Sequence, residues 1–189
     1  MKSIFFVLMF VLFLIPVAFA DHAEVTIIPV DGSGAPGCEE AASGCFIPNT
    51  ATVDVGGVVI MSNTDSAAHT FTSGIPGDPS GLFDTGLLMA ENSYEYSPDT
   101  VGEIPYYCMV HPWMIGLIIV QEVEAEEETH DETHEEEHDD DYPLPEPGSR
   151  IPQWVKNIFL WFGQDQISEE EIINAIEYLI DEGTIEVGN

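Results

Sequence analysis

Residues 106–120 read YYCMVHPWMIGLIIV. The first part places Cys108, His111 and Met114 at C-x2-H-x2-M spacing, so that a thiol, an imidazole and a thioether lie within seven residues. The second part, residues 116–120, is a short β-branched and apolar run, which is typical of a buried strand. We therefore expect a loop with three candidate metal ligands that leads directly into a strand.

Short runs of the same kind recur through residues 21–121. They alternate with Gly, Pro, Asn and Asp, which favour turns. The clearest of these runs are residues 24–28, 51–55, 58–61 and 116–120. Several short strands at such spacing predict an all-β fold, a sandwich or a barrel.

The loop at residues 108–114 leaves a fourth ligand position to be supplied from elsewhere in the β region. His69, at the end of a predicted strand, is the only other histidine well inside that region. Two imidazoles and a thiolate in a plane, with a long axial thioether, form the geometry of blue-copper electron-transfer sites. These residue types therefore point to copper bound by His69, Cys108, His111 and Met114.

On these residues the chain resembles the cupredoxins, in particular the plastocyanin and amicyanin group. The resemblance covers about residues 21–121 and includes the Asn and His-Thr of the first ligand region, a Gly-Glu before the ligand strand, and the Tyr-x-Cys-x2-His-Pro-x-Met loop. The short spacing from Cys to Met is like that of amicyanin. The resemblance implies a Greek-key β-sandwich that binds one type 1 copper ion through His69, Cys108, His111 and Met114.

The resemblance also implies how electrons would enter and leave. In the family the exposed edge of the second ligand histidine, here His111, is the electron port. An apolar contact patch would surround it, formed by Ile75, Pro76, Pro112 and Trp113. One residue departs from the family pattern, because Thr70 follows the first ligand histidine where the family often has Asn. A threonine hydroxyl could still tie the two ligand loops together.

The other two cysteines, Cys38 and Cys45, are separated by six residues and flanked by glycine. With Cys108 assigned to the metal, we predict a Cys38–Cys45 disulfide, and the alternative is two free thiols.

The first twenty residues predict a signal peptide, with Lys2, an apolar run and a small-residue motif that indicates cleavage after Ala20. The alternative is a retained membrane anchor. We therefore expect a secreted or extracytoplasmic protein.

The chain after the β region changes composition twice. Residues 122–149 contain 14 acidic residues and a proline-rich end, which predict an extended, disordered linker. His130, His134 and His138 lie within it and could bind a metal ion, although a plain spacer is the favoured interpretation. Residues 150–189 predict a small helical hairpin. Its signals are Pro152 at one start, Gly163 at one end, and a capping box in which Ser168 and Glu171 begin the second helix.

The hairpin sequence resembles a module of secreted proteins from ammonia-oxidising archaea, which suggests an archaeal source and implies no activity. Its aromatic side is expected to dock onto a partner or the cell envelope, including membrane proteins. Self-association is the alternative.

The formal charge of −32 excludes a nucleic-acid-binding protein of the usual basic kind. We expect an extracytoplasmic electron carrier rather than an enzyme, whose donor and acceptor proteins carry basic patches. The alternative function is copper storage or delivery by the cupredoxin site together with the linker histidines.

Overall fold

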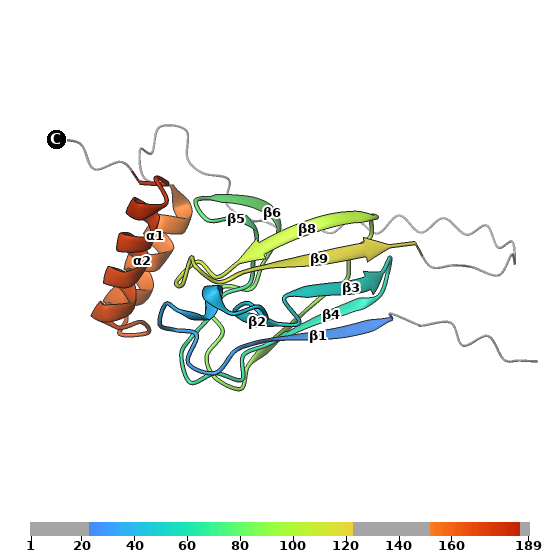
Figure 1. Ribbon diagram of the computed structural model, residues 1–189, viewed down its shortest axis with the longest axis horizontal. Helices are drawn as coiled ribbons and strands as arrows, with labels where there is room; N and C mark the ends of the chain where they lie inside the picture. Colours follow the sequence, from blue (N-terminus) through green and yellow to red (C-terminus); the bar gives the residue numbers. More distant parts are fainter. Residues whose placement is uncertain (1–22, 123–151, 186–189) are drawn as a thin grey trace, which may run out of the picture.

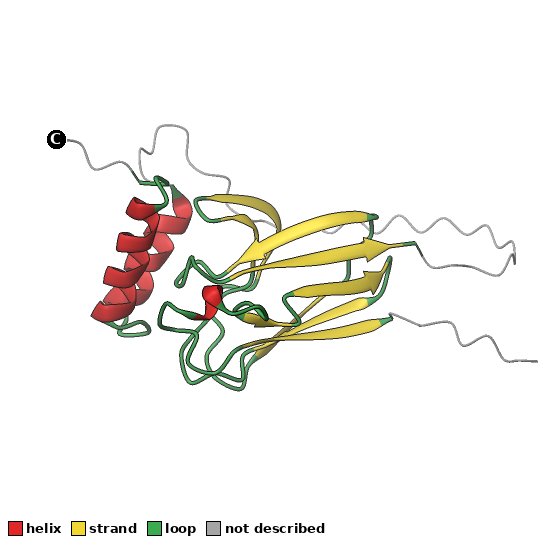
Figure 2. Ribbon diagram, in the orientation of Figure 1, coloured by secondary structure: helices red, strands yellow, loops and turns green. Residues whose placement is uncertain are grey.

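The computed structural model describes residues 23–122 and 152–185. These residues form a β domain followed by two C-terminal helices, as Figure 1 and Figure 2 show. The predicted signal peptide, the predicted linker beyond residue 122 and its three histidines lie outside the described residues.

Two sheets build the β domain. One has the strand order β2-β1-β4-β7 and the other has the order β3-β9-β8-β5-β6. The fold-class prediction of an all-β sandwich followed by two helices is therefore confirmed for the described residues. The strands are β1 (Glu24–Pro29), β2 (Phe46–Ile47), β3 (Thr50–Asp54), β4 (Val58–Ser62), β5 (Thr72–Ile75), β6 (Asp78–Asp84), β7 (Ser93–Tyr96), β8 (Gly102–Tyr107) and β9 (Ile115–Gln121), with a short 3-10 turn at Cys38–Glu40.

Alternating burial explains why these runs become strands. In β3 the side chains of Ala51 and Val53 face the core, and in β9 those of Ile118 and Val120 do so. β3 and β9 pair in parallel, with Ala51 opposite Ile118 and Val53 opposite Val120. Side chains two residues apart point to the same face of a sheet, so the paired strands present one continuous apolar surface.

An aromatic cluster fills the centre of the sandwich. Phe46, Phe71 and Tyr106 are almost completely buried. The ring centroid of Phe46 lies 5.0 Å from the centroids of both other rings. Because Tyr106 is in β8 and Phe71 immediately precedes β5, this cluster supports the two strands from which the candidate ligands extend.

The C-terminal helices are α1 (Gln153–Gly163) and α2 (Glu169–Asp181). The predicted capping box is confirmed, since the Glu171 N–H donates to the Ser168 hydroxyl and the Glu171 carboxylate accepts from the Ser168 N–H.

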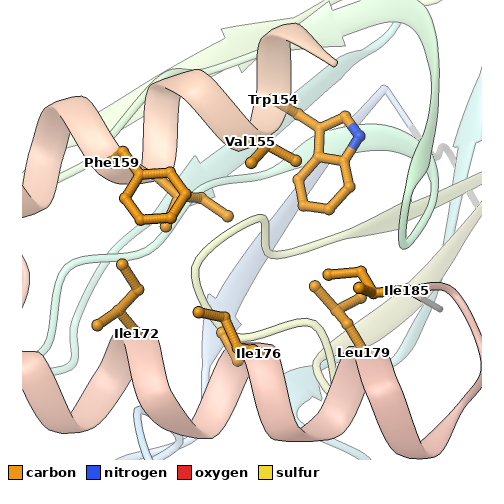
Figure 3. A pocket seen from close by; sticks show the side chains of 9 residues that line it. Trp154, Val155, Phe159, Ile172, Ile176, Leu179 and Ile185 are labelled. Atoms are coloured by element: carbon orange, nitrogen blue, oxygen red, sulfur yellow. The ribbon is translucent and has the colours of Figure 1, made fainter. Parts of the chain in front are cut away.

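An apolar pocket lies between the helices and is lined by residues such as Trp154, Ile172 and Leu179 (Figure 3). Of the hairpin's aromatic residues, Trp154 is buried and Phe159 is exposed. Within the described residues, none of the helices is long and apolar enough to cross a membrane.

The hairpin, as we call α1, α2 and the turn residues up to Ile185, lies across one end of the sandwich (Figure 1). This end carries the loop between β8 and β9, in which three of the four candidate copper ligands occur. We call it the ligand end of the domain.

Candidate metal centre

Strand pairing brings the two ligand segments together. β5 pairs with β8, with Thr72 opposite Tyr107, so the residues before β5 lie beside those after β8. His69 precedes β5 and forms an isolated bridge with Leu88, while Cys108 follows β8 directly. Residues separated by 39 positions in the sequence thus meet at the ligand end.

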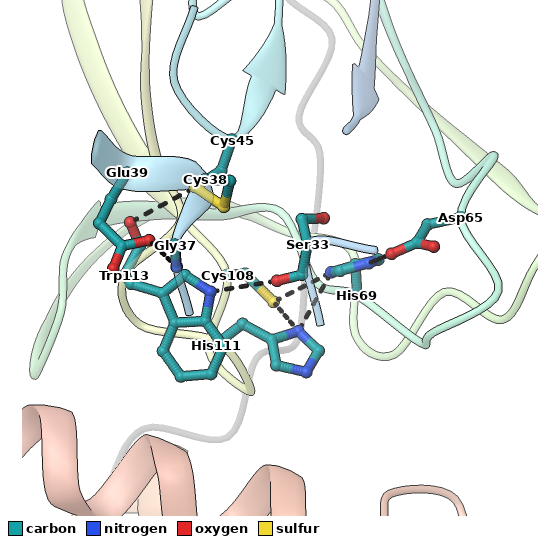
Figure 4. The surroundings of a disulfide bond; sticks show 10 residues. All are labelled: Ser33, Gly37, Cys38, Glu39, Cys45, Asp65, His69, Cys108, His111 and Trp113. Carbon is teal, nitrogen blue, oxygen red and sulfur yellow. Dashed lines mark hydrogen bonds and ion pairs between the residues drawn. A yellow bond between two sulfur atoms is a disulfide. The ribbon is translucent and has the colours of Figure 1, made fainter. Parts of the chain in front are cut away.

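Three donor atoms converge inside the protein (Figure 4). The Sγ atom of Cys108 lies 3.6 Å from His111 Nδ1 and 3.9 Å from His69 Nδ1, and the two Nδ1 atoms are 3.1 Å apart. All three side chains are fully buried. One thiolate and two imidazole nitrogens that face a common point are the donor set of a type 1 copper site, and the residues present fit that ion.

Met114 closes the ligand loop. Its backbone N–H donates to the carbonyl of His111 over 2.9 Å, and its own carbonyl accepts from the Cys108 N–H over 3.0 Å. The Met114 side chain has no exposed surface. Two backbone hydrogen bonds thus hold Cys108, His111 and Met114 in one compact turn, with a soft thioether available as a weak fourth ligand.

Each ligand histidine has a carboxylate on its outer nitrogen. His69 Nε2 donates to Asp65 Oδ2 over 2.9 Å, and His111 Nε2 donates to Glu171 Oε1 over 3.2 Å. Such partners keep a proton on Nε2, so that Nδ1 is the nitrogen that would bind a metal, and they make the imidazole a stronger donor. Sequence analysis identified neither carboxylate as part of the site. Asp65 lies only four residues before His69, and that spacing was the available signal.

Charges within the cluster shift the pKa values of its members. Burial raises the pKa of the Cys108 thiol, but the charge of His111 and hydrogen bonds from both imidazoles outweigh this and hold that pKa well below its usual range. Burial lowers the pKa of His111, whereas the Cys108 thiolate and Glu171 raise it, to about 9 in total. The metal-free site therefore favours a thiolate, which is the form that binds metals.

The threonine that departs from the family pattern does tie the two ligand loops together. The Met109 N–H donates to the Thr70 hydroxyl over 2.7 Å, and the Thr70 N–H donates to Cys108 Sγ over 3.3 Å. Thr70 and Met109 are both buried. The hydroxyl thus links the loop of His69 to the loop of Cys108, as the sequence analysis allowed.

Replacing Thr70 with Val should weaken this link. The buried N–H of Met109 would lose its acceptor, so we expect the free energy of unfolding to fall by about 1–3 kcal/mol. Urea denaturation of the metal-free chain measures the loss. Thr100→Val is the control, because Thr100 is exposed and its hydroxyl donates to the neighbouring side chain of Asp99. Equal stability of the two variants would show that the Thr70 hydroxyl does not hold the loops.

The expected electron port is not exposed in this structure. The side chain of His111 has no exposed surface, and Trp113 is also buried, with its indole N–H donating to the Ser33 carbonyl. Part of the physical reason is the hairpin, since Glu171 accepts from the outer nitrogen of His111 and the ring centroids of Tyr178 and Trp113 lie 6.1 Å apart, edge to face. Of the expected apolar patch, Ile75 is exposed and Pro112 is buried. The prediction of an exposed His111 edge is therefore wrong for the full chain.

Cys38 and Cys45 form a disulfide in the structure, with Cα atoms 4.9 Å apart. Within the described residues these two cysteines and Glu39 form the one further group with metal-ligand composition, and the disulfide removes its thiols. Cys108 is the free cysteine. The copper donor set is thus the only thiol-containing candidate metal site that the described residues offer.

The two-sheet sandwich and the His-Cys-His donor set are those of a cupredoxin-like copper centre. No protein-family model and no curated protein matches the chain. Among solved structures, a purple cupredoxin from Nitrosopumilus maritimus is 29% identical, with 51% of this chain and 98% of that chain covered and a TM-score of 0.45. A mutant amicyanin is 17% identical (52% and 83% covered, TM-score 0.38), and a mutant fern plastocyanin is 24% identical (51% and 100% covered, TM-score 0.39).

Proposed function

We propose that this protein is an extracytoplasmic electron carrier that binds one type 1 copper ion through His69, Cys108, His111 and Met114. The observation that carries the proposal is the convergence of Cys108 Sγ and the two Nδ1 atoms in a fully buried cluster. Copper bound by such donors supplies a one-electron couple between Cu(I) and Cu(II).

The surrounding residues favour electron transfer because they hold the ligands in one arrangement. Thr70 links the two ligand loops, Asp65 orients His69, and two backbone hydrogen bonds close the turn that carries the other ligands. A close-packed environment resists movement of these side chains. Ligands that stay in place need little rearrangement when the charge of the site changes, which suits rapid transfer of single electrons.

The same burial argues against substrate turnover. The ligand side chains have no exposed surface, so the cluster offers a substrate no direct access. An enzyme of this class would need an open ligand position on the metal or a further metal site. We therefore propose a carrier and not an enzyme.

The location and partners follow from sequence features together with the disulfide. The predicted signal peptide and the Cys38–Cys45 bond suit an oxidising compartment outside the cytoplasm. A formal charge of −32 suits redox partners with basic patches. Association with such partners should weaken as salt concentration rises, because salt screens charges on exposed surfaces.

Copper counting separates the carrier from a storage protein. We expect one tightly bound copper per chain in both the wild type and the His130→Ala, His134→Ala, His138→Ala triple variant, with the same rate of electron exchange. The reason is that all four proposed ligands precede residue 122. Metal analysis after dialysis and stopped-flow oxidation measure the two quantities. Loss of most copper in the triple variant would instead favour storage or delivery.

A further inference from the structure

We propose that Glu171 is a positioning residue of the copper centre, which orients His111 and lowers the reduction potential of the site. The inference rests on the proposed function and deepens it, because it makes the C-terminal hairpin part of the metal centre. A group on the outer nitrogen of a ligand histidine fixes the ring and strengthens its donation to the metal.

The geometry of His111 gives Glu171 this role. Nδ1 of the ring faces Cys108 and His69, so Nε2 points to the opposite side, toward the hairpin. There Nε2 donates to Glu171 Oε1 over 3.2 Å. The His111 side chain is fully buried, while that of Glu171 is 20% exposed. The histidine end of the hydrogen bond is therefore shielded from water. A charge interacts more strongly with its neighbours where water is excluded, so the Glu171 carboxylate acts strongly on the imidazole.

The carboxylate of Glu171 is held in place by its own helix. Its second oxygen, Oε2, accepts from the Ser168 N–H over 2.7 Å and from the Ser168 hydroxyl over 2.6 Å. The capping box therefore uses one oxygen while the other faces His111. A carboxylate with both oxygens engaged has little rotational freedom, so its charge stays beside the imidazole.

Two further contacts place the hairpin on the ligand end. Tyr178 lies seven residues after Glu171, on the same face of α2, and its ring meets that of Trp113. At the other end of the hairpin, Thr184 packs so closely on Gly77, in the turn between β5 and β6, that a β-carbon at residue 77 would overlap it. The Glu171 contact is thus supported by two further contacts between the hairpin and the β domain.

Asp65 and Glu171 act on the two histidines in the same way but come from different parts of the fold. Asp65 belongs to the ligand loop itself, and Glu171 belongs to the hairpin 60 residues beyond His111. A negative charge near the copper stabilises the oxidised form, which carries the greater positive charge. Removing the charge of Glu171 should therefore favour the reduced form.

Glu171→Gln tests the charge without removing the side chain. Glutamine also serves at this position of a capping box, but its single oxygen can accept from Ser168 or from His111, whereas Glu171 uses one oxygen for each. We expect the equilibrium between oxidised and reduced copper to shift about tenfold toward the reduced form, a rise of 59 mV for one electron. Protein-film voltammetry of the copper-loaded chain measures the shift.

Two control variants separate charge from structure. Glu170→Gln removes the same charge from an exposed position in the same helical turn, and it should leave the potential unchanged. Ser168→Ala weakens the cap but keeps the Glu171 charge, so it should move the potential less than Glu171→Gln does. An unchanged potential in Glu171→Gln, or an equal shift in either control, would overturn the proposal.

A copper-free measurement tests the contact itself. In the metal-free chain labelled with 15N-histidine, we expect a slowly exchanging Nε2–H signal from His111 that Glu171→Ala removes and Glu170→Ala retains. The Nε2–H of His69, bound to Asp65, is the internal reference and should persist in both variants. If the Nε2–H signal of His111 persists in Glu171→Ala, the proposal is overturned. If the signals behave as expected but the copper-loaded chain lacks a thiolate charge-transfer band, only the hydrogen bond stands, and the proposed function and the tuning role both fail.

Discussion

Cys108→Ser is expected to abolish the intense visible absorption of the copper-loaded chain. That absorption arises from charge transfer between a thiolate and Cu(II), and Cys108 is the one free cysteine of the described residues. A serine hydroxyl is a harder and much weaker ligand, so copper affinity should fall as well. A visible spectrum and a copper titration of the two proteins measure both effects.

The control for this substitution is Met109→Leu. Met109 is the next residue and is buried, and exchange of methionine for leucine conserves volume. This variant should keep the absorption, because the Met109 side chain belongs to the core and not to the donor set. If Cys108→Ser retains the intense band, the thiolate is not a ligand and the type 1 assignment fails.

Phe46→Ala should cause the largest loss of stability among the substitutions considered. The Phe46 ring has no exposed surface and lies 5.0 Å from the rings of Phe71 and Tyr106. Truncation removes the buried ring and leaves a cavity between the sheets, which costs about 3–5 kcal/mol. Urea denaturation of the metal-free protein, with the disulfide intact, measures the change.

The neighbouring residue provides the matched control. Ile47 is in the same two-residue strand but is 48% exposed, so Ile47→Ala should cost much less than Phe46→Ala. Similar losses in both variants would show that the aromatic cluster does not carry the core. The slope of free energy against urea should be alike in the two proteins, because the surface exposed on unfolding changes little.

Much of the β domain could be predicted because its signals are local. Short β-branched runs separated by turn residues indicate strands wherever they occur, and residues 51–55 and 58–61 fall on β3 and β4. Three candidate ligands lie within one loop, so their proximity needs no knowledge of the fold. The second helix was also predictable, because the Ser168 and Glu171 capping box is a local hydrogen-bond pattern.

The role of Glu171 at the site could not be predicted, because its partner is distant in sequence. A capping-box glutamate is explained by its own helix, and no local pattern indicates that its other oxygen, Oε1, reaches His111. Docking of the hairpin depends on matching surfaces from both parts, such as Tyr178 against Trp113. The same missing information explains the error over His111, whose edge is exposed only if nothing beyond the β domain covers it.

The hairpin over His111 belongs to the same chain as the domain that it covers. Contacts within one molecule do not weaken on dilution, and linked modules behave as though the second were present at about millimolar concentration. A soluble redox protein that binds this face must therefore compete with the hairpin, which already covers it. At micromolar concentration, such a protein would need an intrinsic affinity roughly a thousandfold higher than that of the hairpin to occupy the face half of the time.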